Sequence, residues 1–157
     1  MASLTSTPKV FSGDTSIVDS VQQYTLGTKA FDSAGNEYIY MQGVTSCTTG
    51  SWVTYDEDYV TTLLAADAKG PVAVAMAAIS ATTYYGWFCV RGTVSALLAA
   101  NCADNALIGY ESTAGYAGDG RAAGDQIYGA ISRGATTSAA ATDCQIWYPF
   151  VDDAYGS

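Results

Sequence analysis

The sequence predicts an all-β fold, a small single-domain β-barrel or sandwich with an N-terminal arm. The clearest evidence lies in Gly70–Gly92, where the larger apolar side chains fall two residues apart, which is the period of a strand and not of a helix. Runs of aromatic and β-branched residues recur along the chain at intervals of about ten residues, with turn-forming residues between them. The length of 157 residues suits one domain with one core.

The centre of the predicted domain is a buried antiparallel hairpin over Pro71–Val90. In its first strand Val72, Val74 and Met76 alternate with alanines. We expect these three side chains to fill the core, while the small alanines let another layer approach closely. The second strand, Tyr84–Val90, is rich in aromatic residues that suit a pleated surface. The short polar break between the two runs predicts the turn.

The first 24 residues differ from the rest and are predicted to form an arm (1–24), which leaves 25–157 as the β-rich domain. Met1–Gly13 is rich in Ser and Thr and contains Pro8, as is typical of a flexible segment. Asp14–Tyr24 places apolar residues at helical spacing, yet its Val, Ile and Thr residues are poor helix formers. A short helix and an extended arm both remain open for it.

The β-rich domain is predicted to begin with a hairpin of strands Thr28–Phe31 and Glu37–Met41. The turn between them, Asp32–Asn36, contains Asp, Gly and Asn, which favour tight turns. Strand alternation then places Tyr38 and Tyr40 on one face and the intervening apolar residues on the other.

The remaining elements follow from the same pattern of strand runs and turn residues. Thr93–Ala100 is either a strand or a short turn of helix, and Arg133–Thr142 reads as a connection rich in small residues. Further strands are predicted over Gly50–Asp56, Tyr59–Leu64, Ala106–Glu111, Gln126–Ser132 and Cys144–Phe150.

The charge balance restricts the kinds of partner. The formal net charge is −9, and only 13% of the residues are charged. An acidic chain with scattered Lys and Arg is not expected to bind nucleic acid or an anionic membrane surface. No secretory signal or membrane-spanning run is expected from the sequence. So few charges on a small domain favour a surface that is partly covered by a partner protein.

The cysteines are predicted to be free thiols. The four residues lie far apart in the sequence, form no Cys-x-x-Cys pair and follow no recognisable export signal. Buried, reduced side chains are therefore expected, with no intramolecular disulfide.

The residues that support most chemistry are scarce, so we expect a non-enzyme without cofactor or metal. There is no histidine, which removes the commonest general base and metal ligand. The run Asp56–Asp58 offers carboxylates to calcium, but a solvated acidic turn is favoured because its side chains alternate between faces. Asp119 and Asp125 flank a Gly-rich stretch, where a turn role is favoured over a catalytic carboxylate pair.

Aromatic residues are the better candidates for function. Tyr84, Tyr85 and Trp87 stand at the head of the central hairpin. Exposed rings of this kind serve carbohydrate binding and are also enriched at protein interfaces, while packing within the sheet accounts for part of them.

A set of strand and turn residues occurs along the chain in this order: Leu26–Thr28, Asp32, Gly35–Tyr40, Trp52–Asp56, Lys69–Ala75, Tyr85–Trp87, Gly92, Gly129–Ile131 and Trp147–Phe150. Together they resemble small structural proteins of tailed bacteriophage heads, the capsid decoration (cement) proteins. The resemblance covers roughly 22–150, in strand and turn residues more than in a diagnostic motif.

The resemblance implies a β-rich homo-oligomer, with a trimer favoured, that binds the phage major capsid protein on the exterior of the virion. Such a protein assembles in the host cytoplasm and reinforces the capsid without catalysis. We expect capsid contacts at Val10, Phe11, Tyr84 and Tyr85. The alternative is a carbohydrate- or receptor-binding β-module of a phage tail or host surface.

Overall fold

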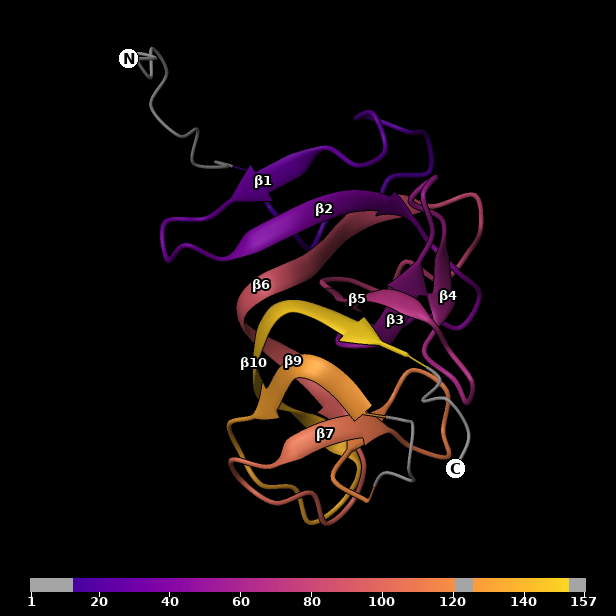
Figure 1. The fold of residues 1–157 in the computed structure, drawn as a ribbon. Coiled ribbons are helices and arrows are strands. Elements are labelled where there is room, and N and C mark those ends of the chain that lie inside the picture. The colour runs from indigo at the N-terminus through magenta and orange to yellow at the C-terminus, as the bar shows by residue number, and fades with distance from the viewer. Residues whose placement is uncertain (1–12, 121–125, 153–157) are drawn as a thin grey trace, which may run out of the picture.

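The computed structural model describes residues 13–120 and 126–152, and within these ranges the chain is all-β, with no helix (Figure 1). The predicted fold class is confirmed. The described residues form ten strands: β1 (Lys29–Phe31), β2 (Glu37–Gln42), β3 (Trp52–Tyr55), β4 (Thr61–Leu63), β5 (Gly70–Ala75), β6 (Tyr85–Leu98), β7 (Leu107–Tyr110), β8 (Ala117–Gly118), β9 (Gln126–Ser132) and β10 (Ala140–Val151).

The strands form one sheet that closes on itself. Its order is β1-β2-β6-β8-β7-β9-β10-β5-β3-β4, with additional pairings of β6 to β10 and to β5. The β6–β10 pairing closes a hydrogen-bonded ring through β8, β7 and β9. Figure 1 shows β6 running from the β1–β2 end of the molecule to the β7–β9 end, so this long strand joins the two ends.

A glycine allows β6 to bend, so that this strand pairs with other strands at both ends of the molecule. Gly92 has a φ of +121°, a conformation that side chains with a Cβ rarely adopt. A Cβ at this position would lie 1.8 Å from Oδ1 of Asn36. That oxygen accepts a hydrogen bond of 3.1 Å from the Thr93 N–H. The β1–β2 turn is therefore joined to the bend of β6.

The central hairpin is confirmed and separates two hydrophobic cores. β5 and β6 pair directly at Val74 with Cys89 and at Ala75 with Phe88. Val72 and Val74 face the first core, which contains Tyr40, Trp52, Trp87 and Ile146 among others. The alanines between them face the second core, which contains Met41, Val53, Ile79 and Phe88. Both faces of β5 are thus buried, as the pattern of large and small side chains predicts.

The β1–β2 hairpin also forms as predicted. Asp32 Oδ1 accepts the backbone N–H groups of Ala34 and Asn36, both at 2.9 Å, and its Oδ2 accepts the Tyr38 hydroxyl at 2.8 Å. Burial alone raises the pKa of a carboxyl, but these hydrogen bonds outweigh it and lower the pKa of Asp32. Tyr38 and Tyr40 share one face and lie in the first core.

The helix alternative for Asp14–Tyr24 is wrong, because this segment consists of a turn, bends and one β-bridge at Asp19, with no helix. Asp19 exchanges two backbone hydrogen bonds of 2.9 Å with Tyr85, at the start of β6. The Tyr40 hydroxyl donates to Asp19 Oδ2 at 2.6 Å. The backbone groups of Asp19 are thus hydrogen-bonded to the start of β6 and not within a helix. The predicted arm before Gly13 lies outside the described residues.

Of the two alternatives for Thr93–Ala100, the strand is correct, and it extends as far as Leu98 within β6. Two other elements differ from the prediction. β10 begins at Ala140 and not at Cys144, because its small first residues pair with Leu97 and Leu98 at the far end of β6. The two-residue strand β8 lies between the predicted strands Ala106–Glu111 and Gln126–Ser132, where no strand was predicted.

Candidate interaction surfaces

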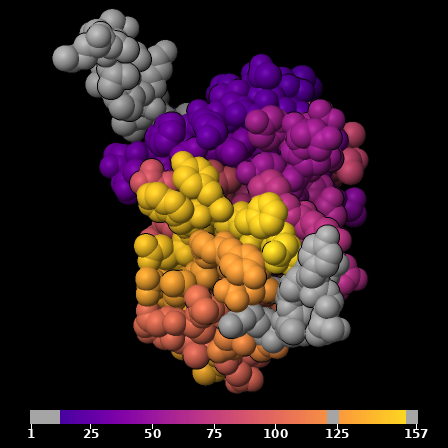
Figure 2. Space-filling model, in the orientation of Figure 1, coloured from indigo at the N-terminus to yellow at the C-terminus, as the bar shows by residue number. Residues whose placement is uncertain are grey.

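Large apolar side chains gather on the outside of β7, β9 and β10. We call this group the aromatic face, and each member is at least 47% exposed: Leu107, Tyr128, Trp147, Tyr148 and Phe150. Phe150 pairs across the sheet with Tyr128 of β9, so their rings share a side. Figure 2 shows side chains of β10 (yellow) and β9 (orange) gathered on one face of the molecule.

A bulge in β10 increases the number of exposed rings. The pairing with β9 shifts register between Ile146 and Phe150, and Tyr148 has a φ of +43°. Opposite the bulge Gly129 has a φ of +75°, and a Cβ there would lie 2.7 Å from the Trp147 carbonyl oxygen. Side chains of a regular strand alternate between faces, whereas Trp147 and Tyr148 are consecutive and both exposed.

Basic side chains flank the aromatic face. The Arg91 guanidinium carbon lies 4.2 Å from the ring centre of Trp147, and Lys29 Nζ lies 5.9 Å from that of Tyr148. Arg133 donates two hydrogen bonds, of 3.0 and 2.6 Å, to Gln145 Oε1 on the same side of β10 as Trp147. Lys9 and Arg121 lie outside the described residues, so three of the other four basic residues border this face.

A buried carboxylate holds the bulge in place. Glu37 is 2% exposed, and its Oε1 lies 3.0 Å from Lys29 Nζ. Its Oε2 accepts a short hydrogen bond from the Tyr148 hydroxyl. These contacts raise the pKa of Lys29 and that of Tyr148, in each case chiefly through the hydrogen bond to Glu37. The sequence carried no signal for this cluster, because Glu37 and Tyr148 are 111 residues apart.

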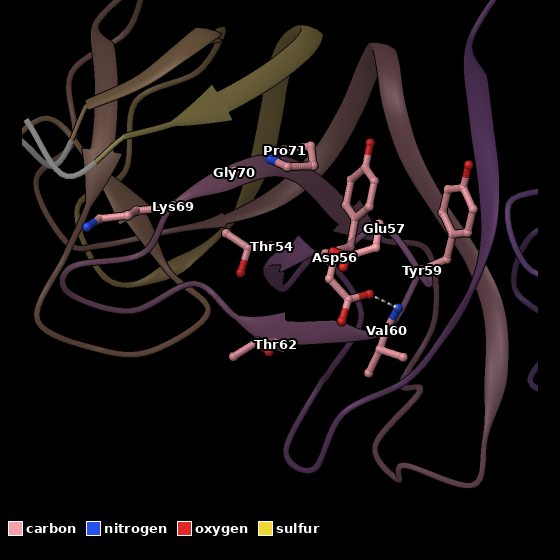
Figure 3. Close-up of a pocket in the computed structure, with 10 residues that line it drawn as sticks. Thr54, Asp56, Glu57, Tyr59, Val60, Thr62, Lys69, Gly70 and Pro71 are labelled. Atoms are coloured by element: carbon pink, nitrogen blue, oxygen red, sulfur yellow. Dashed lines mark hydrogen bonds between the residues drawn. The ribbon is translucent and has the colours of Figure 1, made fainter.

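A groove of about 720 Å³ lies beside the aromatic face (Figure 3). Figure 3 shows Glu57, Tyr59 and Pro71 on one side of the ribbon, with Thr54 and Thr62 on the other. The whole lining is Thr54–Glu57, Tyr59, Val60, Thr62 and Lys69–Pro71.

The groove and the aromatic face are continuous. Phe150 pairs with Pro71, which places both on one side of the sheet. Thr54 pairs with Val72, so the residues next to them, Tyr55 and Pro71, point together to the opposite side. The rings of Tyr55 and Tyr59 lie nearly parallel, at 17°, with their centres 6.2 Å apart. Aromatic side chains therefore extend from Trp147 across β10 to the groove.

The acidic run at the groove is a turn, as favoured from the sequence. Asp56 Oδ1 accepts the N–H groups of Asp58 at 3.0 Å and Val60 at 2.9 Å. Across residues 13–120 and 126–152, no three His, Cys, Asp or Glu side chains group to hold a metal. Asp119 likewise has a structural contact, since its Oδ2 accepts the Ala103 N–H at 2.8 Å. Asp125 lies outside the described residues.

A second exposed group surrounds the start of β6, and we call it the N-terminal apolar surface. Of the predicted capsid contacts, Tyr84 is exposed within this group, while Tyr85 is half-buried and its ring stacks on Tyr40 at 6.4 Å. Val10 and Phe11 lie outside the described residues. Trp87 is 3% exposed and lies in the first core, so for this ring the packing alternative is correct. The members of the surface are Ile17, Val18, Val21, Tyr24 and Tyr84.

All four cysteines are buried and free, as predicted. Burial raises the pKa of the Cys47 thiol to about 11 and those of Cys89 and Cys144 to about 12. It also raises the pKa of Cys102. Because the thiolate is the reactive form, these side chains act as small core residues.

Comparisons with protein-family models, curated proteins and solved structures found no match to this chain. Among the described residues no helix is long and apolar enough to span a membrane. The aromatic face, the groove and the N-terminal apolar surface therefore provide the evidence about function.

Proposed function

We propose that the protein is a bacteriophage capsid decoration protein, which binds the outside of the assembled capsid and stabilises it without catalysis or a cofactor. Its partners are the phage major capsid protein and further copies of itself, with a trimer favoured. The observation that carries the proposal is the pair of exposed apolar surfaces on one β-domain. Patches of this kind on a small soluble domain mark protein interfaces.

We assign the capsid contact to the N-terminal apolar surface. Asp19 holds this segment to Tyr85 through two backbone hydrogen bonds, while Ile17 and Val21 remain more than half exposed. Val10 and Phe11 lie upstream in the sequence and are separated from Ile17 by five small or polar residues. The exposed Tyr84 belongs to the same surface.

An oligomer on this scheme binds the assembled shell better than free capsid subunits. Each contact of a small domain is modest, but linked copies that engage neighbouring subunits gain avidity through effective concentration. Only the assembled lattice holds those subunits at a fixed spacing. Preferential binding to the assembled state stabilises that state by mass action.

The test compares the heat resistance of shells with and without the protein. We expect decorated shells to open at higher temperature, and the double variant Val21→Ser/Tyr84→Ser to bind them at least tenfold more weakly, since interface aromatics dominate binding energy. Thr137→Ala, at an exposed position away from this surface, serves as the control. Equal heat resistance of bare and decorated shells contradicts the proposal.

The second candidate is a carbohydrate- or receptor-binding module of a phage tail or host surface. It is favoured by the groove, where the parallel rings of Tyr55 and Tyr59 lie beside the carboxylates of Asp56 and Glu57. Binding assays with soluble polysaccharides separate the two functions. Specific sugar binding, abolished by Tyr59→Ala, together with no effect on shells selects this alternative.

A further inference from the structure

Two unlike surfaces lie near each other on the molecule. One is the Trp147 end of the aromatic face, where an exposed indole is covered by the Arg91 guanidinium. The other is the groove, which carries Asp56 and Glu57 at its edge. The first is aromatic and basic. The second is hollow, with Asp56 and Glu57 at one end and Lys69 at the other (Figure 3). The Trp147 end is therefore complementary in shape to the groove and in charge to its acidic end.

A single copy cannot bring these two surfaces together. Trp147 pairs with Arg91 of β6, whereas the groove is built on β3, β4 and the start of β5. Phe150, which pairs with Pro71, lies between them in the sheet. Contact between the two surfaces therefore requires two molecules.

We propose that Trp147 of one copy docks in the groove of a second copy, with Arg91 facing Glu57. The inference deepens the self-association part of the proposed function and rests on it. A ring with an odd number of subunits needs a heterologous contact, in which two different surfaces meet. The Trp147 end and the groove supply such a pair.

The contacting groups are free to make this interface. Trp147 is 61% exposed, and the groove is open to solvent with a volume of about 720 Å³. Glu57 is exposed and forms no hydrogen bond or ion pair with any described residue. Asp56 is committed to its own turn through Oδ1. Glu57 is thus the carboxylate available to a guanidinium from another molecule.

Charge favours a second copy as the occupant. The chain carries a net charge of −9, yet three of its described basic side chains border the aromatic face. Two identical acidic molecules repel unless basic and acidic surfaces face one another. Complementary surfaces of this kind set the orientation of a contact as well as its rate of formation.

The test measures the mass of the full chain in solution by analytical ultracentrifugation. We expect an oligomer for the native protein and a dissociation constant raised by about 30-fold or more for Trp147→Ala, as for an interface hot spot. Arg91→Glu and Glu57→Lys should each weaken assembly about tenfold. The double variant Arg91→Glu/Glu57→Lys should recover most of that loss, because it reverses both charges. The control Asp104→Lys changes the net charge as Glu57→Lys does, away from the groove.

The outcomes separate this interface from the capsid contact. A native protein that stays monomeric at high concentration overturns the inference, as does an oligomer that Trp147→Ala and Glu57→Lys leave unchanged. Lack of rescue in the double variant overturns the pairing of Arg91 with Glu57. Thermal unfolding of each variant shows that folding is intact, with midpoints expected within about 2 °C of the native protein at the exposed positions Trp147, Glu57 and Asp104. Arg91 is half-buried and pairs with Glu37, so its charge reversal is expected to lower the midpoint further. Mass is measured without shells, so failed capsid binding with intact assembly refutes only the proposed function.

Discussion

Replacing Gly92 with alanine should destabilise the domain strongly, because the bend of β6 tolerates no Cβ. At a φ of +121° an L-residue is strained, at a cost of about 1–3 kcal/mol. The new methyl group would also displace the Asn36 side chain, since it would lie 1.8 Å from Oδ1. Loss of the hydrogen bond from Thr93 N–H to Asn36 adds about 0.5–1.5 kcal/mol. We therefore expect the free energy of unfolding to fall by about 2–4 kcal/mol.

The assay is equilibrium unfolding in urea, in which the midpoint should fall while the slope m stays constant. In a thermal scan the loss corresponds to about 5–15 °C for a domain of this size. Gly35→Ala is the matched control, because Gly35 has a φ of +84° and a methyl group added there would meet nothing within 4 Å. That variant has backbone strain alone and should lose about 1 kcal/mol.

A double variant separates the clash from the strain. Asn36→Gly removes the three Asn36 atoms that the new methyl group would meet. Gly92→Ala should then cost less in this background, by a coupling of at least about 1 kcal/mol. The reasoning is refuted if Gly92→Ala is no more harmful than Gly35→Ala, or if the two changes are additive.

Three further predictions concern buried polar groups. Titration of the denatured, unreduced protein with a thiol reagent should find the four free thiols, and the native protein should react far more slowly because burial raises their pKa values; finding none when denatured contradicts this. In the folded protein the pKa values of Cys89, Cys144 and Tyr40 are raised to about 12. The stability that these groups contribute is therefore complete below the unfolded thiol pKa of about 8.5 and is lost as the pH rises toward 12. Urea midpoints that do not fall between pH 8 and 11 refute this pH dependence. Tyr40→Phe removes the hydrogen bond to Asp19 and should lower stability by about 1 kcal/mol while hydrogen exchange at Asp19 becomes faster; unchanged exchange there means that the backbone pairing alone holds the segment.

Local patterns were sufficient to predict most of the fold. Alternation of large and small side chains identified β5 with both faces buried, and the Asp32–Asn36 turn followed from its residue types. The start of β10 was missed because Ala140 and Ala141 carry no strand signal and are ordered only by pairing with β6. The local sequence of a strand does not predict which distant strand it pairs with.

The candidate surfaces were harder to predict for the same reason. The aromatic face depends on the register of β10 against β9, which brings Phe150 beside Tyr128. The bulge that exposes Trp147 and Tyr148 is stabilised by Glu37, which lies far away in the sequence. Trp87 looked like an exposed ring but lies in the first core, because its position in β6 faces inward. The clustered aromatics of Trp147–Phe150 were the one available signal.

The position of β10 in the sheet has a consequence for the order of folding during synthesis. This strand pairs with β5, β6 and β9, yet it is translated after all three. Until residues 140–151 leave the ribosome, β5, β6 and β9 each lack one neighbour and expose unpaired backbone and apolar side chains. Contacts over such sequence separations also slow folding. A nascent chain halted before Ala140 should therefore be sensitive to protease and prone to bind chaperones, and release of the remaining residues should end both properties together.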